Sequence, residues 1–184
     1  MSSFRSDVCG TAASLVGAFL LAATVCGRDL RPLLPADGAV AAVRLPADPA
    51  PSERRAAAEL CEALSNMTGR ALVTIAAGDP AEAAIELNFN PSFGPEEYRL
   101  AWAPTGTALR ITGGRPRGVL YGAIGLLHDQ LGCRWFTREV SHIPRNAAPV
   151  LPADLDLHVR PPFEYREVLW TEAFDGDWAM RNRL

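Results

Sequence analysis

Five acidic residues lie close together near the end of the sequence, and carboxylates are the side chains that enzymes use in pairs for acid and base catalysis. They are Glu164, Glu167, Glu172, Asp175 and Asp177. In glycoside hydrolysis the two carboxyl groups face each other across the substrate, and they usually come from different strands. Five acids on one short segment do not meet that condition, and a solvated loop with one or two helix-capping acids accounts for them. We therefore assign no catalytic residue in this chain.

Other residue patterns that would carry chemistry are incomplete. The histidines His128, His142 and His158 form neither an HExxH motif nor a cluster with cysteine at the spacing of metal ligands. The glycine-rich turn over 113–118 lacks the spacing of a dinucleotide fingerprint, and Pro116 removes an amide that would bind a phosphate. The sequence has no G-x-S-x-G elbow and no lysine. We expect no metal ion and no cofactor.

The composition is that of a folded protein. The chain has 184 residues, of which 48% are hydrophobic and 21% are charged, and its formal net charge is −3. This charge does not support nucleic-acid binding, which needs a clustered basic surface. A complete (β/α)8 barrel needs about 250 residues, so the chain is too short to contain one.

The first 27 residues have the pattern of a secretory leader. Leu15–Val25 is an apolar run, and no charged residue occurs between Asp7 and Arg28. Because small and polar residues dilute the run, we expect a signal peptide over 1–27, with an uncleaved membrane anchor as the alternative. The protein is then secreted or periplasmic, and it contacts a membrane only if the leader is retained or Cys26 is lipidated.

Two cysteines, Cys61 and Cys133, remain after the leader. Two cysteines do not make a disulfide framework. Each lies among apolar neighbours, which is typical of a small buried hydrophobic side chain. A single bridge between them in an oxidising compartment is the alternative, and the sequence leaves it open.

Hydrophobic periodicity predicts two helices and a series of short strands. The first helix is capped by Ser52, has apolar residues at helical spacing and ends at Gly69. The second helix begins near Pro116 and ends at Gly132. Strands are expected where apolar residues run together or alternate with polar ones. The predicted strands are 39–45, 72–75, 85–89, 98–102, 109–111 and 134–140, with 98–111 forming an antiparallel hairpin.

These elements predict the α+β fold class, with a mostly antiparallel sheet of four to five strands and two helices on one face. The domain is expected over residues 39–152, and a proline-rich linker over 153–162 follows it. Phe163–Trp170 is then expected to form a new strand, which opens a second unit over 163–184.

The segment Glu96–Gly132 resembles the non-catalytic N-terminal domain of β-N-acetylhexosaminidases and α-glucuronidases. The matching positions are Tyr98, Leu100, Ile111, Gly118, Tyr121, Gly122, Leu127 and Leu131. The continuation Gly132–Phe136 is similar to the α-glucuronidase side. The resemblance spans residues 39–160 and implies a domain shaped like a zinc peptidase fold without the zinc site.

Pro161–Arg166 resembles the junction at which these families enter the first strand of a (β/α)8 barrel. The resemblance implies that residues 163–184 are the start of a truncated catalytic barrel. It also implies that Arg166 binds hydroxyl groups of a sugar, although Glu167 stands where the families have glycine. Trp170 is a candidate for stacking on a sugar face, with a place in the core as the alternative.

We therefore expect the N-terminal accessory domain of a secreted glycoside hydrolase in carbohydrate metabolism, truncated before the catalytic carboxylates. A carbohydrate substrate would bind through the missing barrel, and the domain would pack against that barrel within the same protein. The chain alone is expected to be inactive, and no nucleic-acid partner is expected. The alternative is a stand-alone carbohydrate-binding or cell-surface interaction module.

Overall fold

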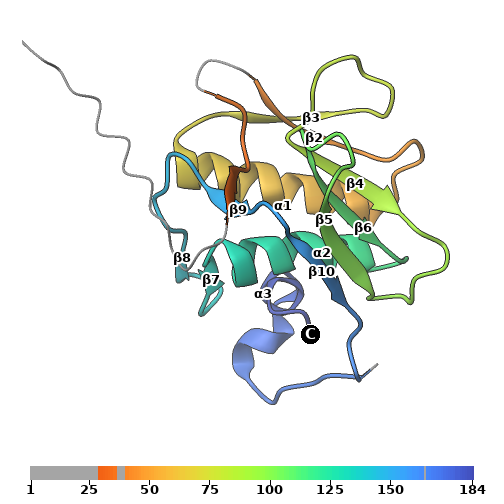
Figure 1. Cartoon of the computed structure of the whole chain (residues 1–184). Coiled ribbons are helices and arrows are strands. Elements are labelled where there is room, and N and C mark those ends of the chain that lie inside the picture. Colours follow the sequence, from red (N-terminus) through yellow and green to blue (C-terminus); the bar gives the residue numbers. More distant parts are fainter. Residues whose placement is uncertain (1–28, 37–39, 164) are drawn as a thin grey trace, which may run out of the picture.

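The computed structural model describes residues 29–36, 40–163 and 165–184. The predicted leader over residues 1–27 lies outside the described residues. None of the helices in the described ranges is long and apolar enough to cross a membrane. Figure 1 shows a mixed sheet, two helices packed side by side on one of its faces, and a C-terminal segment on the outer side of these helices.

The main sheet has six strands in the order β10-β5-β6-β4-β2-β3. Two short pairs of strands, β1 with β9 and β7 with β8, lie outside it. The bounds are β1 Leu30–Pro32, β2 Ala41–Arg44, β3 Leu72–Ile75, β4 Ile85–Phe89, β5 Tyr98–Trp102, β6 Leu109–Gly113, β7 Arg134–Trp135, β8 Ser141–His142, β9 Val150–Pro152 and β10 Asp156–Val159.

The α+β class is confirmed, but the expectation of a mostly antiparallel sheet is wrong. In the main sheet the pairs β2–β3, β2–β4 and β4–β6 are parallel, whereas β5–β6 and β10–β5 are antiparallel. This sheet also has six strands instead of the expected four to five. Helix α1, Pro51–Thr68, follows β2 and returns the chain in parallel into β3. In the sheet, β6 lies between β5 and β4. It is antiparallel to β5, its hairpin partner, and parallel to β4. The sequence shows the hairpin turn, but it does not show which distant strand each edge will meet.

Helix α1 begins slightly earlier than the sequence predicts, and it ends as predicted. Its N-cap residue is Ala50 and not the predicted Ser52. The backbone N–H of Ala50 donates to the Glu53 carboxylate at 2.7 Å, so the Glu53 side chain satisfies a backbone donor at this end of the helix. Gly69 ends the helix in the left-handed conformation, with φ of 74°. Its apolar stripe is buried against the sheet and the second helix: Ala56, Leu60, Ala63, Leu64 and Met67.

The second helix consists of α2, Gly118–Gly125, followed by the π-helical turn η1, Leu126–Gln130. All residues of α2 are buried, because the sheet, α1 and the C-terminal segment surround it. A Cβ at Gly122 would lie 2.7 Å from a methyl carbon of Ile111, so glycine lets the helix approach β6 closely.

The predicted linker over 153–162 contains part of the sheet. Residues 156–159 form β10, which pairs with β5, and the indole N–H of Trp102 donates to the carbonyl of Pro152 at 2.8 Å. The proline-rich pattern did not predict this strand. The strand is short, and its hydrogen bonds come from the edge of β5, which is distant in sequence.

The predicted strand over 163–170 is not formed in the described part of the chain. Residues 165–170 belong to no helix or strand, and they lead into a 3-10 helix, η2 Thr171–Phe174, and helix α3, Gly176–Arg181. A parallel barrel strand receives its hydrogen bonds from neighbouring barrel strands. The described residues supply none, so the expected start of a barrel is not confirmed.

Both described cysteines are free thiols. Cys133 is buried in the core, and burial raises the pKa of its thiol to about 11. Cys61 is half-buried and lies 3.6 Å from the Thr74 hydroxyl, and burial raises its pKa as well. Each cysteine therefore contributes packing in this structure, and no disulfide joins them.

Candidate functional site

The first charged cluster on the helical side surrounds Glu96, whose side chain is almost completely buried. Its Oε1 lies 2.6 Å from Nη2 of Arg117, and its Oε2 lies 2.5 Å from Nη2 of Arg166. Both guanidinium groups also lie over the ring of Tyr121, 5.7 and 5.8 Å from its centroid. A buried carboxylate is stable when charged donors satisfy it, so this cluster holds Arg166 against the domain.

The glycine-rich turn before α2 positions one of these arginines. A Cβ at Gly114 would lie 2.0 Å from the carbonyl oxygen of Gly94, so only glycine allows the two backbones to approach this closely. In the same turn the N–H of Arg117 donates to the carbonyl of Pro95 at 2.9 Å. The turn thus brings the Arg117 side chain beside the buried carboxylate.

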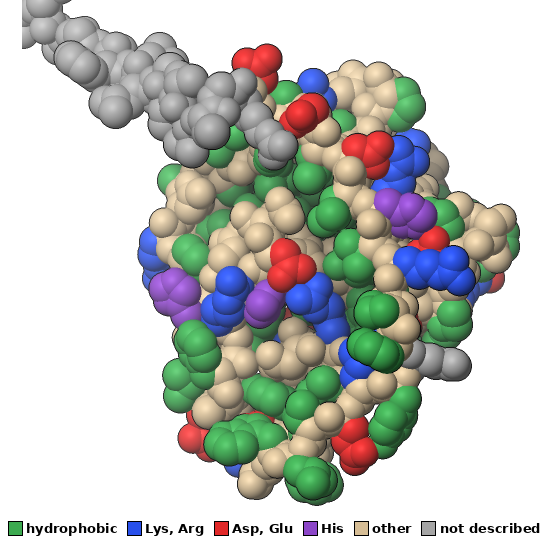
Figure 2. All heavy atoms as spheres, turned by 60° about the horizontal axis from the view of Figure 1, so that its bottom comes forward, with side chains coloured by type: hydrophobic (Ala, Val, Ile, Leu, Met, Phe, Trp, Pro, Cys, Tyr) green, Lys and Arg blue, Asp and Glu red, His purple; other side chains and the backbone are tan. Residues whose placement is uncertain are grey.

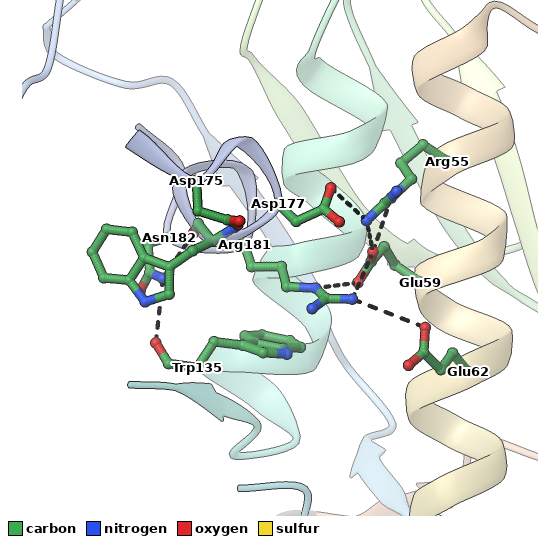
Figure 3. A network of polar contacts seen from close by, with 9 residues as sticks. Arg55, Glu59, Glu62, Trp135, Asp175, Asp177, Arg181 and Asn182 are labelled. Atoms are coloured by element: carbon green, nitrogen blue, oxygen red, sulfur yellow. Dashed lines mark hydrogen bonds and ion pairs between the residues drawn. The ribbon is translucent and has the colours of Figure 1, made fainter. Parts of the chain in front are cut away.

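A second cluster surrounds Glu59 on α1 (Figure 3). Its carboxylate accepts hydrogen bonds from Arg181 of α3, at 2.8 and 3.1 Å, and forms an ion pair at 2.6 Å with Arg55, one helical turn earlier. Figure 3 shows the Arg181 side chain lying over the ring of Trp135, and its guanidinium carbon is 5.7 Å from the ring centroid. Asp177 of α3 lies 3.0 Å from Arg55. The cluster therefore joins α3 to α1.

A third cluster lies at the end of the second helix. Arg183 binds the Asp129 carboxylate through both terminal nitrogens, at 2.7 and 3.1 Å, and Nδ1 of His128 lies 2.8 Å from the same carboxylate. Burial raises the pKa of Asp129, but the hydrogen bonds from Arg183 and His128 outweigh burial and hold this pKa below its usual range. Burial raises the pKa of the Tyr98 hydroxyl, which Arg183 also contacts at 3.4 Å.

These three clusters share one arrangement, in which an arginine of the C-terminal segment meets a carboxylate of the sheet-helix domain. We call them the arginine clamp, and its pairs are Arg166 with Glu96, Arg181 with Glu59, and Arg183 with Asp129. Arginine suits this role because its guanidinium stays charged and binds carboxylates with two parallel donors. The clamp fixes residues 165–184 on the outer side of α1 and α2.

The sequence predicts two substrate-binding residues, Arg166 and Trp170, and their surroundings in the structure differ. All three kinds of guanidinium nitrogen of Arg166 are engaged: Nη2 with Glu96, Nη1 with the carbonyl of Phe163 at 2.7 Å, and Nε with the carbonyl of Arg183 at 3.1 Å. Trp170 is 56% exposed and precedes η2. In the described ranges no hydrogen bond or ring contact joins Arg166 to Trp170.

The buried acids were not identified as site residues from the sequence, yet one signal for them is present. Glu53 and Glu59 lie on α1, and both are nearly inaccessible to solvent. Acidic residues are almost never fully buried unless they are paired, so acids that recur on the apolar stripe of a helix predict basic partners elsewhere in the chain. The identity of those partners, Arg115 and Arg181, requires the tertiary structure.

Next to the clamp, the C-terminal segment exposes a row of large apolar side chains. We call it the apolar row, and its members are Phe163, Tyr165, Val168, Leu169, Trp170 and Phe174. Leu169 is 95% exposed and Phe174 is 89% exposed. Figure 2 shows hydrophobic side chains gathered on the lower part of this face of the molecule. Large apolar side chains that are exposed together on one segment are candidates for contact with another protein surface.

The described residues contain no group of three or more side chains that would hold a metal ion. The charged clusters consist of carboxylates already paired with arginines, so they are contacts that position the segment. This part of the molecule therefore combines charged clusters that are paired internally with apolar side chains that are exposed.

Comparison with known structures identifies the fold. A mutant β-hexosaminidase from Streptomyces plicatus, in complex with the product GlcNAc, is 24% identical and superposes with a TM-score of 0.50. The family 20 β-N-acetylhexosaminidase from Streptomyces coelicolor gives the same identity and the same TM-score. Each match covers 76% of this chain and 25% of the other chain, so the chain spans a quarter of the length of these enzymes. No curated protein sequence matches the chain.

The fold is thus that of a non-catalytic domain found within larger β-hexosaminidases. Residues 35–128, just over half of the chain, match the family model for glycosyl hydrolase family 20, domain 2, and the chain belongs to this family. The resemblance to the N-terminal non-catalytic domain of β-N-acetylhexosaminidases is confirmed. The chain therefore contains a glycoside hydrolase-related domain.

Proposed function

We propose that the chain is the accessory domain of an exported glycoside hydrolase, and that it packs against a catalytic barrel in the same protein. The observation that carries this proposal is the apolar row on a segment that the arginine clamp holds in place. Exposed apolar side chains favour contact with another protein surface. About three quarters of each related hexosaminidase lies outside the matched part and could supply that surface.

A barrel is the occupant that fits this surface best. The row begins at Phe163, directly after the last strand of the sheet, so a following domain starts at this face. The clamp supports the row from beneath, because Arg181 and Arg183 are both bonded to carboxylates of the helices. A rigid surface of this kind sets the position of the next domain without the ordering cost of a flexible linker.

The catalytic carboxylates are proposed to lie on the barrel, so the 184-residue chain alone would not hydrolyse glycosides. Three of the five N–H donors of Arg166 bond to Glu96 and to two carbonyl groups, which favours a positioning role over direct contact with a sugar. Trp170 is half exposed and is available either to a sugar face or to the barrel.

Export is the remaining part of the proposal. The apolar run Leu15–Val25 supports a cleaved signal peptide and a secreted or periplasmic location. Mass spectrometry of the protein recovered from the medium or periplasm tests it. A mature chain that still contains Met1 would contradict cleavage.

The first experiment is to sequence the genomic DNA that follows the codon for Leu184. A continuous reading frame for a barrel of about 250 residues supports the proposal, and the longer protein should then hydrolyse aryl glycosides. An immediate stop codon contradicts the proposal for this chain.

A second experiment tests the apolar row directly. The double variant with Leu169→Ser and Phe174→Ser should bind less of a hydrophobic dye and self-associate less than the unchanged chain. Phe136→Ser is the matched control, since Phe136 is also exposed but lies outside the row. If the control variant has the same effect as the double variant, the row is not a specific docking surface.

A further inference from the structure

A hollow of about 430 Å³ has no clamp residue in its lining. It is formed where β2, β3 and β4 end, and these three neighbouring strands are parallel. After β2 the chain passes through α1 to β3 on one side, whereas after β4 it passes to β5 and β6 on the other side. In sheets with parallel strands, ligands bind at this kind of point, where connections diverge beyond the carboxyl ends of the strands.

Two buried donor atoms in this hollow are unsatisfied. Among the residues that the structure describes, neither Nε of Arg44 nor Nδ2 of Asn88 has a hydrogen-bond partner. Both residues line the hollow. Buried polar atoms in native proteins nearly always have partners, and those that do not are candidates for a bound ligand or water. Each of these atoms is a donor, so the missing partner is an acceptor.

The charges around the hollow leave Arg44 without a carboxylate. Its register partner on β4, Glu86, gives its carboxylate to Arg110 at 3.0 Å, and the guanidinium of Arg115 is paired with Glu53 at 3.0 Å. Arg44 itself donates from Nη2 to the carbonyl of Ala81. In the described ranges no ion pair neutralises Arg44, so Arg44 is the group in the hollow that an anion would pair with.

The rim of the hollow adds acceptors and an apolar surface. Asp48 is exposed at the rim, and its carboxylate can accept hydrogen bonds from ligand hydroxyl groups. Phe89 is 38% exposed, and the guanidinium carbon of Arg115 lies 4.3 Å from its ring centroid. The hollow thus combines unsatisfied donors, the carboxylate of Asp48, which is unpaired within the described residues, the carboxylate of Glu86 that is paired with Arg110, and an aromatic ring. Its volume lies within the range of ligand clefts, about 300–1,000 Å³.

We propose that this hollow binds a small hydroxylated ligand that carries one oxyanion, as an acidic sugar does. The oxyanion accepts hydrogen bonds from Arg44 and Asn88, the ligand hydroxyl groups donate to Asp48, and an apolar ring face lies against Phe89. Because the two unsatisfied donor atoms are covered in the unliganded structure, the side chains of Arg44 and Asn88 turn toward the ligand as it enters. The sugar part of the inference rests on the proposed function, whereas the oxyanion part rests on the hollow alone.

Titration of the 184-residue chain, followed by calorimetry and by NMR shifts, tests the site with three probes: galacturonate, inorganic phosphate and neutral galactose. We expect galacturonate to bind more tightly than either other probe, because only galacturonate satisfies the donors and the rim together. Arg44→Met should weaken the binding by about tenfold or more, since it removes the charged donor. Asn88→Leu should also weaken it, while the midpoint of thermal unfolding is not lowered, because the variant removes an unsatisfied buried donor.

Arg99→Met is the matched control. Arg99 lies on β5 of the same sheet and is paired with Asp156, away from the hollow, so its loss should leave galacturonate binding unchanged. Phosphate binding as tight as galacturonate binding would overturn the sugar part and leave an oxyanion site only. No binding of either anion, or an equal effect of the Arg99 and Arg44 variants, would overturn the site. None of these outcomes depends on a catalytic barrel, so they are independent of the test of the proposed function.

Discussion

Replacement of Arg181 by methionine is the sharpest test of the arginine clamp. Methionine retains an unbranched apolar side chain over Trp135 and removes the two hydrogen bonds to Glu59, at 2.8 and 3.1 Å. The side chain of Glu59 is 4% exposed and that of Arg181 is 22% exposed, so solvent replaces the lost bonds poorly. The carboxylate keeps its partner Arg55 at 2.6 Å, which limits the loss.

The expected cost follows from these contacts. Hydrogen bonds to charged groups contribute about 1.5–3 kcal/mol net, and the remaining pair with Arg55 places the estimate for Arg181→Met at about 2 kcal/mol. Because each 1.4 kcal/mol is tenfold in an equilibrium constant, amide protection of α3 should fall by about 30-fold. Hydrogen exchange of peptides that cover residues 171–184, followed by mass spectrometry, measures this change directly.

Arg138→Met is the control for this experiment. The side chain of Arg138 is 66% exposed, and its ion pair, at 3.7 Å, is with Glu139, whose side chain is itself 82% exposed. The hydrogen bond from Arg138 to Glu172 comes from the backbone N–H and is kept in the variant. Substitution at such a site should change stability by less than about 0.5 kcal/mol. If exchange over residues 171–184 is the same in the Arg181 variant as in the unchanged chain, the clamp does not hold the C-terminal segment and the reasoning fails.

Three further predictions address other parts of the fold. Gly114→Ala should lower the unfolding free energy by about 3 kcal/mol, because its Cβ would lie 2.0 Å from a carbonyl oxygen, whereas Gly176→Ala, which has open space, should have no such cost in thermal unfolding. Asp129→Asn should destabilise the chain at neutral pH, and its deficit in urea unfolding should shrink as pH falls below 3.8, because the native pKa of Asp129 lies below that value and its stabilisation is lost on protonation. A deficit that is independent of pH would contradict this assignment. Iodoacetamide should label half-buried Cys61 before buried Cys133 in the native chain, since burial raises the pKa of Cys133 to about 11, and peptide mapping that finds the reverse order would contradict it.

Local sequence signals predicted the helix end, the buried helix face and the hairpin correctly. Gly69 ends α1 because it adopts the left-handed conformation, and the apolar stripe of that helix is buried as its spacing predicts. The hairpin of β5 and β6 follows from alternation on both sides of the turn 104–106. In each case the interaction that determines the structure lies within a few residues along the chain.

Elements that depend on partners distant in sequence were predicted wrongly or not at all. β10 lies in a proline-rich stretch and exists because the edge of β5 offers it hydrogen bonds. The parallel order of the central strands depends on the crossover of α1 and on the insertion of β6 beside β4. Phe163–Trp170 reads as a strand, yet it forms none in the described residues, because a strand also needs a neighbour.

The sequence by itself therefore determined the α+β class, both helices of the domain and the resemblance to the hexosaminidase domain, because periodicity, caps and turns act locally. Only the tertiary structure decided the roles of the charged residues. Arg166 meets Glu96 across 70 positions, and Arg181 meets Glu59 across 122. Folding brings such residues together through the packing of the sheet, helices and C-terminal segment, and their pairing has no signature in local spacing.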